Sequence, residues 1–287
     1  PAGVAAATAA AARGHRVVLF EEQGHLGGQI QLARRIPTKG EFNELLRYYK
    51  RQIEVLKIDV RLNTRATVAE LANGFDKIVI ATGIVPRRPA IDGIDRANVV
   101  SYVDVILGRV QVGRRVAIIG AGGIGYDVAE LLTHGEADGE PIQSFLDEYG
   151  VDTTIQRPGG LKLPATPLSP RKVTLFQRRR ERPGSRLGVS TGWILRNHLR
   201  DKGVQFVAGV NYERISESGL HYSVDGVTHV SEVDHVVICA GQEPNLSLMT
   251  ELTGRGLSVR LIGGAERAEE LDAMRAIRQG VEFAYAL

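Results

Sequence analysis

The sequence predicts an α/β fold of two interleaved units, each built around a parallel, doubly wound sheet. Apolar, β-branched strand patterns alternate with helical segments along the 287 residues, and such alternation is typical of parallel sheets covered by helices. One strand pattern occurs twice, at 76–83 and at 234–241. A glycine-rich turn at 120–125 also joins an apolar strand to a helical segment. Together these patterns indicate two βαβ-type units.

The composition is that of an ordinary globular protein, 43% hydrophobic and 24% charged, which excludes collagen-like, disordered and coiled-coil chains. The formal net charge of +3 is too small to imply nucleic-acid binding. The single cysteine, Cys239, excludes an internal disulfide, a redox-active cysteine pair, and an iron–sulfur or cysteine-rich zinc site within this chain. Without a membrane-length apolar run or a signal peptide, we expect a cytoplasmic protein.

The N-terminal segment predicts an alanine-rich helix that opens at Pro1-Ala2-Gly3 and leads to a strand at 16–21. Pro1 stands in place of a start Met, and no strand precedes the helix, so we expect a piece of a longer chain whose first strand is missing. Residues 40–57 then predict an amphipathic helix. Its apolar face contains Phe42, Leu45, Leu46, Tyr49, Ile53 and Leu56.

The repeated pattern at 76–83 and 234–241 starts with an acid, continues as a β-branched run and ends in small residues. Each copy predicts a buried parallel strand whose small terminal residues let a ligand approach the backbone. The candidate contacts are Ala81, Thr82, Gly83 and Gly241. A proline-bearing loop follows each copy. Two ordinary core strands are the alternative interpretation, which the matched pair disfavours.

The second βαβ unit consists of a strand at 115–119, the glycine-rich turn, a helix at 126–132 and a strand at 172–177. Residues 134–170 are too many for an ordinary connection and predict an insertion. Residues 222–238 predict a hairpin that turns at Asp225-Gly226 and returns to a buried strand.

The glycine-rich turn satisfies the G-x-G-x-x-G pattern between a strand and a helix. Its glycines would let backbone amides and the helix N-terminus face a pyrophosphate, which predicts a Rossmann-like dinucleotide site. The glycines concerned are Gly120, Gly122, Gly123 and Gly125. Asp127 is either a simple acid of the first helical turn or a contact to the nicotinamide carboxamide.

The residue that ends the next strand selects the cofactor. Here it is Gln177, followed by Arg178, Arg179 and Arg180, and a neutral residue with arginines suits a 2′-phosphate, so NADPH is favoured over NADH. A solvated basic face is the alternative. Nucleic acid is disfavoured because no aromatic residues are interleaved with the arginines.

The N-terminal unit ends its strand with Glu21, whose carboxylate suits the unphosphorylated ribose of FAD. Gly27-Gly28-Gln29 would bring backbone against that cofactor. We therefore expect a split FAD-binding domain, 1–111 with 235–287, around an NADP-binding domain, 112–234.

Several other signals are set aside. Residues 188–192 have the G-x-S-x-G spelling of a nucleophile elbow, but no strand precedes them. The seven histidines show no metal-ligand spacing, so no metal site is expected. No residue is expected to act as a nucleophile or general base. Trp193 is interpreted as a packing residue or as a cover for a cofactor.

The sequence resembles the C-terminal half of the bacterial 2,4-dienoyl-CoA reductase family, in the old-yellow-enzyme group that includes trimethylamine dehydrogenase. The similarity spans essentially the whole chain. The matching runs lie at 1–3, 20–21, 27–29, 83–87, 91–95, 116–125, 191–194, 237–245, 261–264 and 270–273.

The resemblance implies roles for individual residues. The residues that would contact FAD are Ala2, Glu21, Gln29, Lys39 and Ala66, and the matched runs add Gly3, Gly28, Gly264 and Asp272. Arg178 and Arg179 would hold the 2′-phosphate, and Trp193 would lie near NADP. Glu266 stands where this family tends to have Asp near the flavin.

The resemblance also implies a larger enzyme, with an N-terminal barrel that carries FMN, a [4Fe–4S] cluster and the acyl-CoA site. In the family, NADPH gives a hydride to FAD, and electrons cross the cluster to FMN, which reduces a 2,4-dienoyl-CoA in fatty-acid β-oxidation. This chain would perform the first step only. Its partners would be the barrel, NADPH and flavin, with no nucleic acid and no membrane.

Two alternatives stay open. One is a related enoate or amine dehydrogenase with a different substrate, and the other is a module that binds ADP only structurally. Disulfide-reductase chemistry is excluded by the lone cysteine.

Overall fold

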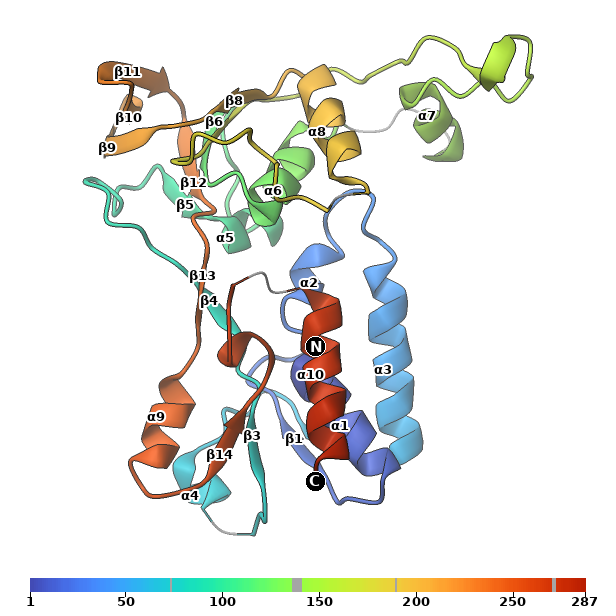
Figure 1. Ribbon diagram of the computed structural model, residues 1–287, viewed down its shortest axis with the longest axis vertical. Helices are drawn as coiled ribbons and strands as arrows, with labels where there is room; N and C mark the ends of the chain where they lie inside the picture. The colour runs from blue at the N-terminus through green and yellow to red at the C-terminus, as the bar shows by residue number, and fades with distance from the viewer. Residues whose placement is uncertain (73, 136–140, 189, 270–271) are drawn as a thin grey trace. The chain divides into compact units, whose positions relative to one another are not determined.

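The computed structural model describes residues 1–72, 74–135, 141–188, 190–269 and 272–287 (Figure 1). The chain forms two units, Pro1–Arg87 with Gln242–Leu287, and Arg88–Gly241. These bounds differ from the expected divisions after residues 111 and 234. The reason is that β5 (Val99–Ser101) and β12 (His235–Ile238) pair with each other and belong to the central sheet of the second unit.

The second unit confirms the predicted α/β class. Its sheet has the order β5-β12-β6-β7-β8 and every pairing is parallel. The remaining strands are β6 (Arg115–Ile119), β7 (Lys172–Phe176) and β8 (Gln205–Val207). The last four residues of β6 are almost completely buried, as expected for a central strand covered on both faces.

Different layers cover the two faces of this sheet. Ala117 and Ile119 pack against the antiparallel ribbon of β9 (Asn211–Ser216), β10 (Gly219–Val224) and β11 (Val227–Glu232). Val116 and Ile118 point to the opposite face because strand side chains alternate. The helices α5 (Tyr102–Ile106), α6 (Gly123–Thr133) and α8 (Gly192–Asp201) belong to that helical layer.

The predicted hairpin is confirmed. Val224 pairs with Val227, so Asp225 and Gly226 form a two-residue turn, with φ of 52° and 82°. Positive φ at both central residues is the requirement of the type I′ turn, which Asp-Gly satisfies.

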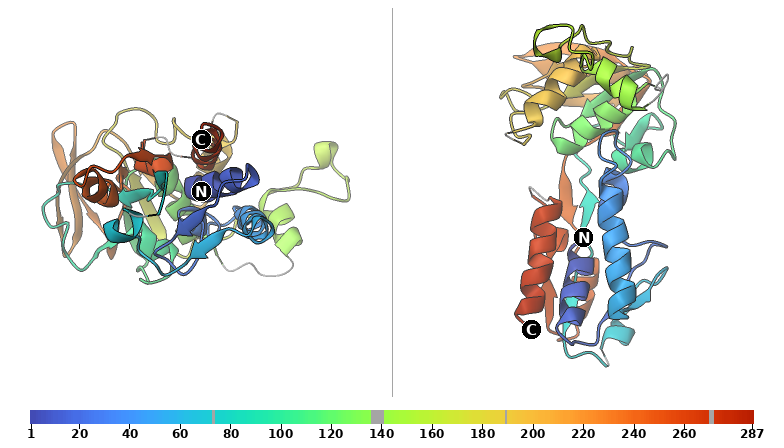
Figure 2. Two further views of the ribbon diagram at one scale, coloured as in Figure 1. Left: turned by 90° about the horizontal axis from the view of Figure 1, so that it is seen from below. Right: turned by 90° about the vertical axis from the view of Figure 1, so that its right-hand side faces the viewer.

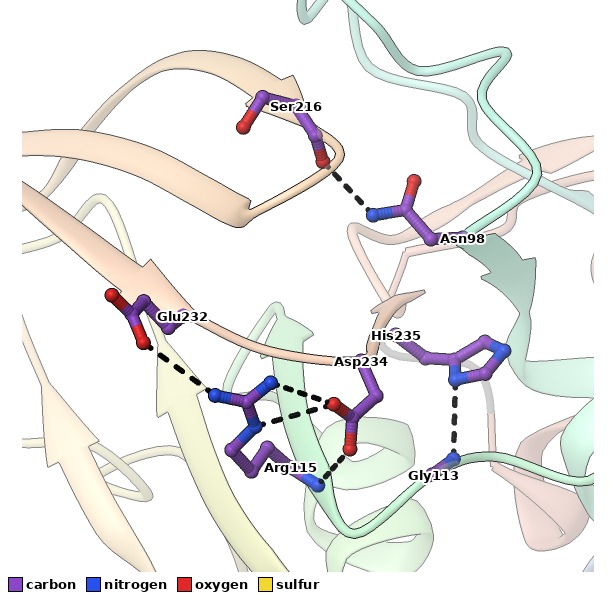
Figure 3. A network of polar contacts seen from close by, with 7 residues as sticks. All are labelled: Asn98, Gly113, Arg115, Ser216, Glu232, Asp234 and His235. Atoms are coloured by element: carbon purple, nitrogen blue, oxygen red, sulfur yellow. Dashed lines mark hydrogen bonds and ion pairs between the residues drawn. The ribbon is translucent and has the colours of Figure 1, made fainter.

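Polar contacts hold the starts of β6 and β12 in register (Figure 3). The Asp234 carboxylate accepts hydrogen bonds from the Arg115 backbone N–H at 2.8 Å and from its guanidinium at 2.9 Å. Glu232 lies 3.5 Å from the same guanidinium, and the Gly113 N–H donates to His235 Nδ1 at 3.1 Å. The backbone and guanidinium bonds of Arg115 hold the pKa of Asp234 below its usual value. The acid that opens the second copy of the repeated pattern thus fixes strand register.

The first unit contains two parallel strand pairs. β1 (Val18–Phe20) pairs with β2 (Asp59–Arg61), and β3 (Ile78–Ile80) pairs with β14 (Val259–Leu261). Figure 2 shows α1 (Ala2–Ala12) lying between α10 (Ala273–Tyr285) and α3 (Phe42–Leu56). The predicted apolar face of α3 is half-buried along its whole length. The buried alanines of α1 have small side chains, which allow the helix to pack closely against α10 and α3.

The proline-bearing loops that follow the repeated strands are themselves strands. β4 (Ile84–Pro86) and β13 (Gln242–Pro244) form an antiparallel pair. Thr82 donates to the Asn245 carbonyl at 2.6 Å and the Asn245 N–H donates to Gly83 at 3.0 Å. The prediction of loops at these two positions was wrong, because the segments pair with each other and a two-stranded ribbon has only edge strands, where proline is tolerated.

The other helices are short, and the predicted insertion contains its own elements. The first unit holds α2 (Ile30–Ala33), α4 (Val68–Leu71), α9 (Ser247–Thr253) and a 3₁₀ turn at Gly263–Ala265. The insertion carries α7 (Pro141–Glu148) and a 3₁₀ turn at Pro158–Gly160, while its residues 136–140 lie outside the described part. No helix within the described ranges is long and apolar enough to cross a membrane.

Candidate nucleotide-binding sites

The glycine-rich turn of the second unit lies between β6 and α6, as predicted. An ideal Cβ on Gly125 would overlap the Gly120 carbonyl oxygen and lie 3.0 Å from its carbonyl carbon. By contrast, a Cβ on Gly122 or Gly123 would meet no atom within 4 Å. The absence of a side chain at Gly125 therefore allows α6 to pack closely on the turn. Gly122 and Gly123 leave the unpaired amides of the first helical turn open to a ligand.

The arginine loop, residues 177–186, follows the neighbouring strand β7. The Gly120 N–H donates to the Phe176 carbonyl at 2.9 Å, so the glycine-rich turn and the start of the arginine loop lie at adjacent strand ends. Arg178 and Arg179 are exposed. The structure thus brings together the glycines and the arginines that the sequence proposed for the pyrophosphate and the 2′-phosphate.

Asp127 and Cys239 lie near each other at the end of β12. The Cys239 N–H donates to Ile119 at 2.8 Å. Burial, and then the Asp127 carboxylate, raise the pKa of the Cys239 thiol far above its usual value. Since the thiolate is the reactive form, this buried cysteine is held inert. Gly241 follows in an exposed turn with φ of 104°.

Trp193 lies in the first turn of α8. Its side chain is 54% exposed and its indole N–H donates to the Ser190 carbonyl at 3.0 Å. The Trp193 ring is thus largely open to solvent, and whether it packs or covers a cofactor stays a prediction. The elbow-like run at 188–192 includes residue 189, which is outside the described ranges.

In the first unit, the start of α1 is the meeting point of the predicted FAD residues. An ideal Cβ on Gly28 would lie 3.7 Å from Pro1 Cδ, and one on Gly3 would lie 3.0 Å from Ala81 Cβ. Burial lowers the pKa of the Pro1 amino group, and the negative charge of Glu21 partly opposes this. The Glu21 carboxylate is thus close enough to the start of α1 for its charge to act there.

The remaining predicted FAD residues lie in several local settings. Gln29 precedes α2, and Lys39 follows a turn closed by its N–H to Ile36 at 3.0 Å. Ala66 packs in a cluster with Leu71. These positions belong to the first unit and remain candidate contacts.

The C-terminal candidates for FAD contact lie before α10 and at its N-terminal end. Gly264 lies in the 3₁₀ turn before the helix, and Asp272 caps α10 by accepting the Arg275 N–H at 2.6 Å. Glu266 accepts a hydrogen bond from Gln279, whose other amide atom accepts the Gly263 N–H at 2.9 Å. Residues 270–271 of the matched run fall outside the described part.

Sequence reasoning missed a buried charged cluster in the second unit. Lys202 Nζ lies 3.1 Å from Glu130 Oε1 and 3.4 Å from Glu148 Oε1. His198 Nε2 lies 3.4 Å and 3.3 Å from the same two oxygens. The cluster joins α6, α7 and α8. One signal for it was available, a glutamate at position 130 among the apolar neighbours of residues 128–132.

Acid is expected to weaken the fold through Glu130. Burial is the largest influence on Glu130 and opposes ionisation, but His198 and Lys202 together outweigh it, so its pKa lies below the ordinary 4.5. A carboxyl with a lowered pKa in the folded state stabilises the protein above its unfolded-state pKa, and the contribution disappears as the pH falls through the folded value. Urea unfolding should thus show a declining free energy below about pH 4.5, with a smaller slope in E130Q. Identical slopes would contradict this.

The comparisons with known proteins agree with this geometry. The family model of pyridine nucleotide-disulphide oxidoreductases matches residues 1–271. A metal reductase of Desulforamulus reducens is 27% identical over 285 residues, covering 97% of this chain and 41% of the relative. An N,N-dimethylglycine/sarcosine dehydrogenase of Chromohalobacter salexigens is 39% identical over 125 residues, covering 41% of this chain and 18% of the relative. A solved 2-naphthoyl-CoA reductase with 2-naphthoyl-CoA has a TM-score of 0.82 and 26% identity, covering 100% of this chain and 38% of the other.

The chain thus spans 41% of the metal reductase and 38% of the 2-naphthoyl-CoA reductase. The general expectation, a flavoprotein oxidoreductase fold that uses FAD and a pyridine nucleotide, is confirmed. With a family model that matches nearly its whole length and the predicted dinucleotide fold in place, the chain belongs to the pyridine nucleotide-disulphide oxidoreductase family.

Proposed function

We propose that the first unit binds FAD and that the second unit binds NADPH, whose hydride reduces this FAD. The whole protein would be a reductase that acts on a 2,4-dienoyl-CoA thioester. The observation that carries this proposal is the contrast between the two nucleotide sites. A carboxylate, Glu21, accompanies the helix start in the first unit, whereas Arg178 and Arg179 accompany the glycine-rich turn in the second. A plain ribose suits the former and a 2′-phosphate suits the latter.

Each residue has a role in binding and orientation. The Glu21 carboxylate would accept hydrogen bonds from the adenosine ribose of FAD, next to the amides that open α1. In the second unit, the open amides beside Gly122 and Gly123 would hold the pyrophosphate, and Arg178 and Arg179 would hold the 2′-phosphate. FAD, when bound, supplies an acceptor for the hydride of the nicotinamide. The chain's own task is alignment and electrostatics, without a nucleophile or a general base.

The substrate follows from the wider similarity. The resemblance to 2,4-dienoyl-CoA reductases and the similarity to 2-naphthoyl-CoA reductase both favour an unsaturated acyl-CoA thioester. We propose that FMN, a [4Fe–4S] cluster and the thioester bind in a barrel outside this chain, and that the protein works in the cytoplasm. An amine dehydrogenase is the second candidate, supported by the similarity to N,N-dimethylglycine/sarcosine dehydrogenase.

The full-length protein reconstituted with FAD should lose its oxidised-flavin absorbance when NADPH is added without oxygen. Reoxidation by a 2,4-dienoyl-CoA supports the reductase, while flavin reduction by dimethylglycine or sarcosine supports the amine dehydrogenase. A protein whose flavin is not bleached by NADPH would overturn the proposal.

The double variant R178A/R179A should raise the KM for NADPH by about 10- to 100-fold, since a hydrogen bond to a charged group contributes about 1.5–3 kcal/mol. The KM for NADH should change by less than about twofold, because NADH has no 2′-phosphate. R109A is the control, since Arg109 is an exposed arginine of the same unit paired with Asp104. Equal increases for NADPH and NADH would favour the module that binds ADP only structurally.

A further inference from the structure

We propose that Glu181 is an internal counter-ion of the arginine loop, which competes with the 2′-phosphate and limits the preference for NADPH over NADH. This inference rests on the proposed function. It concerns a carboxylate that lies among the arginines and is not itself proposed to bind the phosphate.

The Glu181 carboxylate bridges two guanidinium groups with a single oxygen. Glu181 Oε1 lies 3.4 Å from Arg179 Nη1 and 3.2 Å from Arg186 Nε. The side chains of Arg179, Arg186 and Glu181 are 58%, 64% and 40% exposed. A dissolved anion can therefore reach the same guanidinium groups that Glu181 occupies.

Hydrogen bonds to the backbone carbonyls of Arg179 and Glu181 hold the part of the loop that carries both side chains. The Gln177 side-chain amide donates to the carbonyl of Arg179 at 3.0 Å and to that of Glu181. The Gly209 N–H also donates to the Arg179 carbonyl, at 2.9 Å. Gln177 is thus a positioning residue, since a carboxylate at this strand end could not donate to either carbonyl.

The other cations of the loop differ in their surroundings. Arg180 pairs with Asp225 of the hairpin turn at 2.7 Å, which directs it toward the hairpin. Within the described ranges, the Arg178 guanidinium makes no hydrogen bond or ion pair. Its positive charge partly opposes the burial that raises the pKa of Tyr212. Arg178 is therefore available to a phosphate without competition, whereas Arg179 must exchange one anion for another.

Displacing Glu181 from Arg179 costs free energy only when NADPH binds. Exposed ion pairs are weak, about 0.2–1 kcal/mol each, so a phosphate dianion can displace Glu181. The displaced carboxylate stays close to the phosphate because the backbone of the loop is held, and the two negative charges repel. NADH brings no phosphate to this position, so its affinity is insensitive to Glu181.

The test compares E181Q with wild type in the full-length protein. E181Q keeps the size of the side chain and removes its charge. We expect the Kd of NADPH and of 2′,5′-ADP to fall about three- to tenfold, with the Kd of NADH and of 5′-ADP changed by less than about twofold. The gain should shrink at high ionic strength, because salt screens exposed charges. E181A should show the same direction.

E232Q is the matched control. Glu232 also pairs with an arginine, Arg115, but at the opposite end of the strands, so E232Q should leave all four dissociation constants unchanged. An E181Q protein with the NADPH-to-NADH ratio of E232Q, or with weaker NADPH binding, would overturn the inference. If R178A/R179A still loses NADPH selectivity in that case, the proposed function stands. A wild-type protein without any NADPH preference would overturn both.

Discussion

Replacing Gly125 with valine is expected to destabilise the second unit and to weaken its binding of NADPH. Any Cβ at this position overlaps the Gly120 carbonyl, which is backbone and cannot rotate away. Helix α6 must therefore move off the end of β6. Overpacking usually costs about 1–3 kcal/mol, and we expect at least about 3 kcal/mol here because backbone has to shift. The KM for NADPH should rise about tenfold or more, since the amides proposed to face the pyrophosphate move with the helix.

The matched control for this prediction is G123A. A Cβ on Gly123 meets no atom within 4 Å, and alanine is a better helix former than glycine by about 1 kcal/mol. G123A should therefore keep the thermal stability of wild type while its methyl group hinders the phosphate. The pair separates folding from binding, with thermal melting and NADPH titration as the measurements. If G125V binds NADPH like wild type, the tight packing of α6 on the turn is not required for the site.

Replacing Lys202 with methionine is expected to cost about 3–5 kcal/mol of unfolding free energy, the range for breaking a buried ion pair. The Lys202 side chain is 1% exposed, and those of its partners Glu130 and Glu148 are 4% and 16% exposed. Without the ammonium group, two carboxylates face each other in the interior with only His198 beside them. Urea unfolding at neutral pH measures the effect.

Two further variants give that result its meaning. E130Q/K202M should recover part of the stability, because it removes one of the unpaired carboxylates. R47A breaks an exposed pair with Glu44, whose side chains are 77% and 65% exposed, and should cost no more than about 1 kcal/mol. A K202M protein no less stable than R47A would show that the buried cluster does not hold α6, α7 and α8 together.

The cluster also bears on how the insertion is attached. Glu148 ends α7, and Tyr149 next to it stacks on His198 with ring centroids 5.5 Å apart. Through these contacts the insertion helix is joined to α8, the helix that carries Trp193. Burying a charged cluster of this kind is costly unless every charge is paired. Because the cluster contacts α6, α7 and α8, removing its ammonium group in K202M tests the packing of all three helices.

The sequence by itself determined the parts of the fold that depend on near neighbours. The glycine pattern at 120–125 predicted the turn between β6 and α6, and Asp225-Gly226 predicted the hairpin turn, because both conformations follow from local backbone geometry. The alternation of strands and helices predicted a parallel sheet, because a helix between two strands is the usual connection between parallel neighbours. The glycines and arginines proposed for the pyrophosphate and the 2′-phosphate could thus be placed at neighbouring strand ends from the sequence alone.

Only the tertiary structure decided which distant residues meet. The unit bounds follow from the pairing of β5 with β12, and the β4–β13 ribbon joins segments more than 150 residues apart, as does the Thr82–Asn245 hydrogen bond. The capture of Arg179 by Glu181 and the burial of Lys202 between two glutamates depend on side-chain packing in three dimensions. Such pairings have no periodicity along the chain, since they are selected by the free energy of the assembled core and surface.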